Sequence, residues 1–209
     1  MMETQLQSPA QGSPEWMAER LGKFTASNIY RLMGKPGNKT AQTYILERAA
    51  EVLTGRPMAE VFGPALDWGK ENEPLAKHWY TRRTGNQVQE VGYVPLDEYA
   101  GGSPDGLIGK LGLIEIKCPF NTTNHIRFAM MKEQSDLLDI APEYYYQIQM
   151  NLLCTGRKWA HFVSFDPRID LECGLFIMEV QRDQQAIELM SERIKEATDE
   201  LNRIISTLK

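Results

Sequence analysis

The spacing of hydrophobic and polar residues changes along the chain and divides it into helical and extended segments. Spacing and end signals together predict helices over 13–21, 25–34, 41–54, 65–84, 143–154 and 183–208. Short apolar or alternating runs predict strands over 87–95, 106–108, 113–117, 159–165 and 175–180. No internal repeat is visible, and the mixed order predicts an α/β fold with a central sheet flanked by helices.

Several helix ends are marked by residues with a clear local role. Ser13 can cap the first helix with Pro14 in its first turn, and Thr25 can cap the second. Gly55 stops the third helix. Pro74 falls inside the 65–84 segment and must either start a new helix or kink an existing one, because it lacks a backbone N–H.

The segment 113–117 carries the most informative pattern, since apolar and charged residues alternate along it. As a strand, it places Glu115 and Lys117 on one face and the isoleucines between them on the other. A glycine-bounded turn over 109–112 can fold it against the short apolar run 106–108 as a hairpin. Asp105 directly precedes that run, so the hairpin would bring two carboxylates and an ammonium group together.

These three side chains suit the hydrolysis of a phosphodiester. The carboxylates of Asp105 and Glu115, with the backbone carbonyl of Ile116, offer the hard oxygen ligands that Mg²⁺ prefers. Lys117 can then orient or deprotonate a water molecule and offset charge on phosphorus. The alternative from the residues alone is a surface Glu–Lys pair on an edge strand, with Asp105 as an ordinary turn residue.

Length and composition favour a compact single domain. The chain has 209 residues, of which 42% are hydrophobic and 24% charged, values that are ordinary for a globular protein. Residues 1–12 are rich in Gln, Ser, Pro and Gly, and we expect a flexible tail followed by one domain over 13–209 that ends in the long helix. No apolar run approaches the ~20 residues of a membrane span and no secretory signal is visible, so we expect a cytoplasmic protein.

The cysteines and histidines give no sign of a further metal or redox centre. Cys118, Cys154 and Cys173 are odd in number and far apart, so we expect them to be reduced and mostly packed. The three histidines have no metal-ligand spacing, and we interpret them as structural; they are His78, His125 and His161. No phosphate-binding Gly-x-x-x-x-Gly-Lys-Ser/Thr loop is present, so ATP is not implied.

A phosphodiester backbone is polyanionic, so the formal net charge of −5 is unexpected for an enzyme that would cleave it. A basic cleft or ring interior with an acidic exterior would resolve the conflict, because only the lining meets phosphate. Each basic residue is individually better explained as a solvated surface charge. Candidates for the lining are Lys23, Lys35, Lys39, Arg82, Arg83, Lys110, Arg127 and Lys132.

The residues around the triad extend the pattern. Gly-Gly-Ser103-Pro-Asp105-Gly followed by Glu115-x-Lys117-Cys-Pro resembles the PD-(D/E)XK nucleases, specifically the YqaJ/lambda-exonuclease family of phage recombination proteins. The resemblance covers roughly 13–185 in compatible order and implies a restriction-endonuclease-like domain with a central mixed sheet. Its other matching segments are 14–27, 68–76, 144–150 and 165–168.

The resemblance implies roles for further residues. Arg20, Ser27 and Ser103 match a pocket for a terminal 5′-phosphate, and a guanidinium with two hydroxyls suits that dianion. Their alternative is a surface arginine with two helix-cap or turn hydroxyls. Glu73 matches an acidic residue that reaches the metal or its waters; otherwise it is a first-turn carboxylate favoured by a helix dipole.

Tyr144 and Gln147 match positions near the metal site. By helical spacing they share a face with Asn151, and the alternative is a polar stripe at the edge of the core.

The activity implied by the resemblance is an ATP-independent 5′→3′ exonuclease on double-stranded DNA that uses Mg²⁺, with Mn²⁺ as a substitute. Such an enzyme leaves a 3′ single strand for a partner annealing protein, and the family closes three subunits into a ring around DNA. Two alternatives stay open: an endonuclease or junction resolvase of the same superfamily, and a DNA-end-binding scaffold without catalysis.

Overall fold

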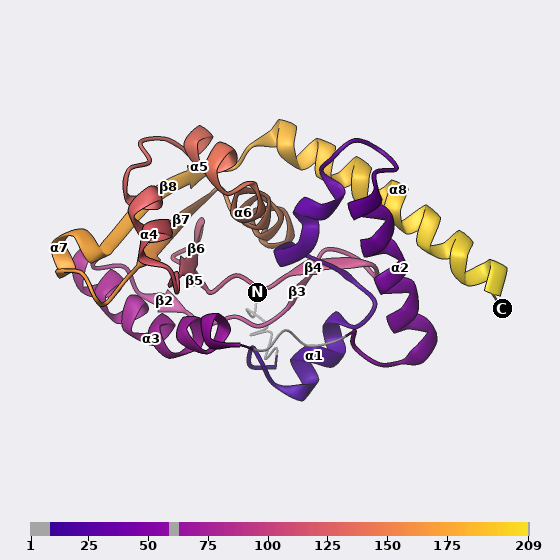
Figure 1. Ribbon diagram of the computed structural model, residues 1–209, viewed down its shortest axis with the longest axis horizontal. Coiled ribbons are helices and arrows are strands. Elements are labelled where there is room, and N and C mark those ends of the chain that lie inside the picture. The colour runs from indigo at the N-terminus through magenta and orange to yellow at the C-terminus, as the bar shows by residue number, and fades with distance from the viewer. Residues whose placement is uncertain (1–8, 59–62, 209) are drawn as a thin grey trace.

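The computed structural model describes residues 9–58 and 63–208, and these form two sheets surrounded by helices (Figure 1). The helices are α1 (Pro14–Arg20), η1 (Ala26–Leu32, a 3₁₀ helix), α2 (Lys39–Thr54), α3 (Pro64–Thr84), α4 (Thr122–Ala129), α5 (Gln134–Ile140), α6 (Pro142–Thr155), α7 (Leu171–Gly174) and α8 (Gln184–Leu208). The strands are β1 (Phe24–Thr25), β2 (Val88–Gln89), β3 (Val94–Pro95), β4 (Ala100–Gly102), β5 (Gly106–Ile108), β6 (Gly112–Lys117), β7 (Trp159–Phe165) and β8 (Leu175–Gln181).

The larger sheet has the strand order β2-β5-β6-β7-β8, with β6 at its centre. β6 pairs antiparallel with β5, so Gly106 lies opposite Ile114, and it pairs parallel with β7, so Lys117 lies opposite Ser164. A smaller sheet has the order β1-β4-β3. The α/β class and the mixed sheet flanked by helices are therefore confirmed, although the strands divide between two sheets.

Both faces of β6 are covered by helices. On one face, Ile114 belongs to a hydrophobic cluster with Ala76 and Tyr80 of α3. On the other, Leu113 packs in a cluster with Ile148 of α6. The face that carries Glu115 is thus also interior, and a charged side chain there needs partners.

A third cluster anchors the N-terminal part of the domain. Phe24 of β1 and Ile29 of η1 pack with Tyr44 of α2 and Met190 of α8. In Figure 1 the helix α8 crosses α2 and extends beyond it to the C-terminus. This packing fixes the segment that follows α1, and Arg20 and Ser27 flank that segment.

Most of the predicted elements are confirmed. Ser13 caps α1 by accepting a hydrogen bond from Trp16 N, and Gly55 ends α2 in the left-handed conformation. α6, β7, β8 and α8 lie within one or two residues of their predicted bounds. The 105–117 hairpin forms as predicted, with β5 and β6 antiparallel.

Two predicted elements differ from the structure, one in helix type and one in extent. The helix over 25–34 is the 3₁₀ helix η1, and Thr25 makes no side-chain cap bond, because it is held in β1 opposite Gly101. The strand over 87–95 divides into β2 and β3, which belong to different sheets. Pro74 begins no new helix, since α3 continues through it.

Three further observations bear on the sequence-based expectations. Within the described ranges, no helix is long and apolar enough to span a membrane. The three cysteines are free thiols, and Cys173 is exposed while Cys118 and Cys154 are partly buried. The expected tail lies mostly outside the described residues, but Gln11 within it donates to the carbonyl of Pro104.

Candidate active site

The open end of the β5–β6 hairpin brings Asp105 against β6. The backbone N–H of Asp105 donates to the Ile114 carbonyl (3.2 Å), and its Oδ2 accepts from the N–H of Ile116 (2.6 Å). β5 pairing ends at Gly106, so the carboxylate of Asp105 replaces the next strand residue as the partner of β6.

Glu115 is completely buried and receives hydrogen bonds on both carboxylate oxygens. Its Oε1 accepts from Lys117 Nζ (2.8 Å) and from Gln147 Nε2 (2.6 Å). Its Oε2 accepts from Asn151 Nδ2 (3.1 Å). Lys117 Nζ also lies 3.3 Å from Gln147 Oε1 and 4.6 Å from the centre of the Tyr144 ring. The predicted strand face and the predicted helix face therefore meet.

The charges of the triad are strongly coupled. Burial raises the pKa of Asp105 well above its ordinary value, and the nearby Glu115 raises it further. Burial likewise raises the pKa of Glu115, although Lys117 opposes the shift. Burial alone would lower the pKa of Lys117, but attraction to the two carboxylates outweighs it and raises that pKa. The pair of buried acids is only partly compensated, which favours additional positive charge at this point.

The oxygen atoms around the acidic pair fit a hard divalent cation. The N–H and C=O of one strand residue point to the same side, so the Ile116 carbonyl faces the edge of β6 that Asp105 occupies. Glu73 of α3 lies at the same cleft, where Lys77 Nζ pairs with it at 2.9 Å. Within 9–58 and 63–208, no three His, Cys, Asp or Glu side chains are placed to hold a metal by themselves. Two carboxylates and a carbonyl leave positions for water and phosphate, as Mg²⁺ requires.

A second group of polar residues lies at the N-terminal side of the cleft. The guanidinium of Arg20 stacks 3.8 Å from the Trp16 ring centre, and its Nη2 lies 3.5 Å from Ser27 Oγ. Trp16 Nε1 donates to Ser103 Oγ (3.1 Å), which joins α1 to the loop before Asp105. Burial lowers the pKa of Arg20, a desolvation that a bound anion would offset. The structure thus brings Arg20, Ser27 and Ser103 together.

One cleft, of about 410 Å³, contains both groups. It is lined by all ten predicted site residues: Arg20, Ser27, Glu73, Ser103, Asp105, Glu115, Ile116, Lys117, Tyr144 and Gln147. Helix α3 forms one wall, and α1 with η1 forms another. An anion held by Arg20 would therefore lie in the same space as the acidic pair.

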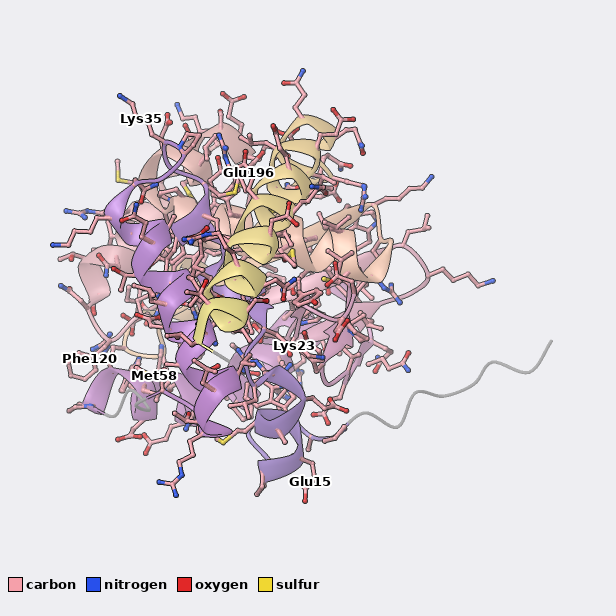
Figure 2. All side chains as sticks on the ribbon, turned by 90° about the vertical axis from the view of Figure 1, so that its right-hand side faces the viewer. Glu15, Lys23, Lys35, Met58, Phe120 and Glu196 are labelled. Atoms are coloured by element: carbon pink, nitrogen blue, oxygen red, sulfur yellow. The ribbon has the colours of Figure 1, made fainter. Side chains whose placement is uncertain are left out.

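The basic residues proposed as a DNA lining lie outside this cleft. Among the described residues that line it, the basic ones are Arg20, Lys70 and Lys117. Arg83 instead donates to the carbonyls of Leu175 (2.6 Å) and Leu171 (2.7 Å) and so holds α7 and β8. Figure 2 shows Lys35 extending outward at the edge of the molecule, and Lys35 does not line the cleft.

Three residues of the site carry no role in the sequence-based interpretation. Trp16 supports both Arg20 and Ser103, and only its aromatic character within the 14–27 segment indicated it. Lys70 lies one helical turn before Glu73, a spacing that could have found it. Asn151 was placed on the correct helix face, but its bond to Glu115 could not be predicted from spacing alone.

An acidic pair and a lysine on a central hairpin, within a mixed sheet flanked by helices, form the arrangement expected from the resemblance to the PD-(D/E)XK nucleases. The family model described as the YqaJ-like viral recombinase domain matches residues 15–158. The chain therefore belongs to the YqaJ-like viral recombinase family, and it is an enzyme of the nuclease class.

Solved structures agree with this assignment. An alkaline exonuclease from Laribacter hongkongensis, LHK-Exo, is 36% identical with a TM-score of 0.83, over 94% of this chain and 96% of that one. Its complex with dAMP is 38% identical with a TM-score of 0.82 over the same shares of the two chains. A phage-related exonuclease from Haemophilus somnus 129PT, 18% identical with a TM-score of 0.75 over 90% and 96%, shares the fold. No curated protein matches the chain.

Proposed function

We propose that the protein is a Mg²⁺-dependent, ATP-independent 5′→3′ exonuclease on double-stranded DNA. The observation that carries the proposal is the single cleft that contains the Asp105–Glu115–Lys117 triad and the group formed by Arg20 and Ser27. A nuclease that only cuts internally meets no terminal phosphate, so Arg20 and Ser27 would have no end-binding purpose in it.

Asp105, Glu115 and the carbonyl of Ile116 would hold the Mg²⁺ ion, with Glu73 directed at the ion or its waters. When bound, the ion would polarise a phosphate oxygen and activate a water molecule. Mn²⁺ has the same preference for oxygen ligands and is expected to substitute.

Lys117 would act on the attacking water and on the phosphate. The two carboxylates keep it as an ammonium group, which suits orientation of the water and compensation of negative charge on phosphorus. Gln147 and the ring of Tyr144 hold the ammonium in place from α6.

Arg20, Ser27 and Ser103 would bind the 5′-phosphate of the strand being shortened. Hydrolysis joins the water oxygen to phosphorus and breaks the P–O3′ bond, and the O3′ atom takes up a proton. The terminal nucleotide leaves as a 5′-monophosphate, while the shortened strand keeps a new 5′-phosphate. The end group that Arg20 recognises is thus regenerated at every cut, and a complex of LHK-Exo with dAMP supports a mononucleotide product.

The biological role that we propose follows from this polarity. Removal of one strand from its 5′ end leaves a 3′ single strand, which suits strand-annealing recombination with a partner annealing protein. Membership of a viral recombinase family supports this role.

Incubation of the purified protein with Mg²⁺ and either linear or closed-circular duplex tests the proposal. An exonuclease degrades only the linear DNA and releases 5′-mononucleotides. Degradation of both forms would identify an endonuclease or junction resolvase, and degradation of neither would identify an end-binding scaffold. A chelator should abolish the activity, and added ATP should not change it.

A further inference from the structure

Asn151 is the one donor to Glu115, among the described residues, that does not line the cleft. It lies on α6, one turn after Gln147, and its side chain is completely buried. Its Nδ2 donates to Glu115 Oε2, whereas Lys117 and Gln147 both bond to Oε1 from within the cleft. Among the described residues, the side-chain hydrogen bond that links Asn151 to the cleft is therefore the one to Glu115.

The other end of the same amide has an unusual environment. Asn151 Oδ1 is buried and has no hydrogen-bond partner among the described residues. It packs on Gly102 of β4, where a Cβ atom would lie only 2.2 Å from it. An unpaired buried acceptor costs free energy, and the hydrogen bond made by this amide is the one from its donor end to Glu115. The absence of a side chain at Gly102 leaves room for this amide.

We propose that Asn151 is a positioning residue that fixes the plane of the Glu115 carboxylate from behind the cleft. Substrate can compete for Lys117 and Gln147, because both line the cleft and carry polar groups that a phosphate or a water can engage. The Asn151 bond is shielded from that competition and holds Oε2 while the contacts at Oε1 change. This inference rests on the proposed function, in which Glu115 is a ligand of the metal.

Two variants and one matched control test the role. Asn151→Ala removes the amide, and Asn151→Asp keeps its shape but replaces the donor with an acceptor. Gln149→Ala is the control, because Gln149 is also completely buried on α6 and bonds through both ends, to the Gln181 carbonyl (2.9 Å) and from Asp183 N (2.8 Å). Those bonds lie away from Glu115, so the control measures the structural cost of losing a buried amide.

We expect both Asn151 variants to lower kcat by about 10–100-fold, the usual effect of removing a group that orients a metal ligand. KM for linear duplex should stay close to the wild-type value, since Asn151 does not face the DNA. Calorimetric titration with Mn²⁺ should show weaker binding in both variants. Gln149→Ala should lower Tm while leaving kcat and Mn²⁺ binding unchanged.

Two results would overturn the inference. One is a wild-type kcat and Mn²⁺ affinity in Asn151→Asp, and the other is an equal loss of kcat in Gln149→Ala. If Asn151→Ala does not fold, Asn151→Asp decides, because it keeps the volume of the side chain. A wild-type protein that cleaves no DNA would instead refute the proposed function, so the two failures are distinguishable.

Discussion

Glu115 lies in the middle of a central strand whose neighbours along the chain, Ile114 and Ile116, belong to the core. A carboxylate at such a position is costly to bury and is tolerated because three side chains donate to it. Removing any one donor leaves a buried acceptor less satisfied. The three donors therefore hold a carboxylate at a position where an apolar side chain would otherwise be expected.

Loss of Lys117 or Asp105 should remove the activity while preserving the fold. Lys117→Ala and Asp105→Ala are each expected to lower the cleavage rate by at least ~10³ in Mg²⁺, because charge at the reacting phosphate is then left uncompensated or the cation is lost. Cleavage rates on linear duplex measure the loss of activity. Circular dichroism spectra of each variant show whether the fold is preserved.

Lys195→Ala is a suitable control, because Lys195 forms an exposed ion pair with Asp199 on α8. It should cleave at the wild-type rate. A Lys117→Ala enzyme that cuts at a near wild-type rate would show that the triad is misassigned, and DNA binding by this variant should survive.

Arg20 should control the response to the DNA end. Wild-type enzyme should digest 5′-phosphorylated duplex faster than 5′-hydroxyl duplex, and Arg20→Ala should remove the difference, because the guanidinium is the charged group of the end pocket. Initial rates on the two substrates measure this. Arg203→Ala, which loses only an exposed pair with Glu200, should keep the preference. Equal slowing of Arg20→Ala on both substrates would indicate a general electrostatic role instead.

At the scale of single residues, period-two alternation was enough to place Glu115 and Lys117 on one face, because strand geometry leaves no other choice. The resemblance supplied the roles of Arg20, Ser27 and Ser103, of which Arg20 and Ser27 are far from the triad in sequence. Asn151 shows what remained hidden: its contact with Glu115 depends on how closely α6 approaches β6 and on the space left by Gly102.

At the scale of elements, Asp166 and Arg168 tie the ends of β7 and β6 together. Asp166 is completely buried and accepts from the backbone N and the guanidinium of Arg168, which also donates to the carbonyls of Pro119 and Phe120. In Figure 2, Phe120 lies at the periphery of the molecule. These hydrogen bonds of Asp166 and Arg168, here called the clamp, therefore fix the chain just after Lys117.

This clamp should make stability depend on pH in the acid range. Burial opposes ionisation of Asp166, but the hydrogen bonds from Arg168 prevail and lower its pKa to about 2. A carboxyl whose folded pKa lies below its unfolded pKa of about 4 stabilises the protein above that value, and the contribution disappears as the pH falls toward 2. Asp166→Asn should cost about 1–2 kcal/mol at pH 7, allowing for the exposure of Arg168.

Urea denaturation of wild type and Asp166→Asn at several pH values between 7 and 3 measures the difference in unfolding free energy. That difference should shrink as the pH falls below about 4. A constant difference across the series would mean that Asp166 acts through packing and not through its charge.

Element types were predictable where one physical signal dominates. Ser13 and Gly55 mark helix ends by local chemistry, so α1 and the end of α2 were placed correctly. The prediction that Thr25 caps a helix was wrong, because Thr25 is held in β1 by pairing with β4 and its side chain makes no cap bond. The strand over 87–95 was divided because β2 and β3 join different sheets, and that pairing is set by tertiary contacts.

At the scale of the whole molecule, the negative net charge and the small size both make it difficult for one subunit to retain a DNA duplex. The net charge is −5, and the described basic residues of the cleft are few, namely Arg20, Lys70 and Lys117. A single small acidic domain has little surface with which to retain a duplex through many cycles. Figure 2 shows an exterior on which acidic side chains such as Glu15 and Glu196 point outward.

A closed ring would solve this problem, and we propose a cyclic homotrimer. Its interfaces would be heterologous, with one surface of each subunit bound to a different surface of the next. A rotation of one third of a turn between neighbouring subunits would close the ring. Duplex would enter a tapered channel lined by Lys and Arg from three copies, and a single strand would leave on the other side. The acidic exterior would then limit nonspecific binding to other DNA.

Light scattering should give three times the chain mass of 23.9 kDa at working concentration. Digestion of a labelled long linear duplex can be started first, and excess unlabelled duplex added afterwards as a competitor. The enzyme should continue along the labelled molecules that it already encircles, because a ring cannot release DNA sideways. Raising the salt concentration should slow loading more than it slows continued digestion, since encirclement does not depend on counterion release. A monomer mass together with digestion that stops after a few nucleotides would exclude the ring and leave the nuclease assignment in place.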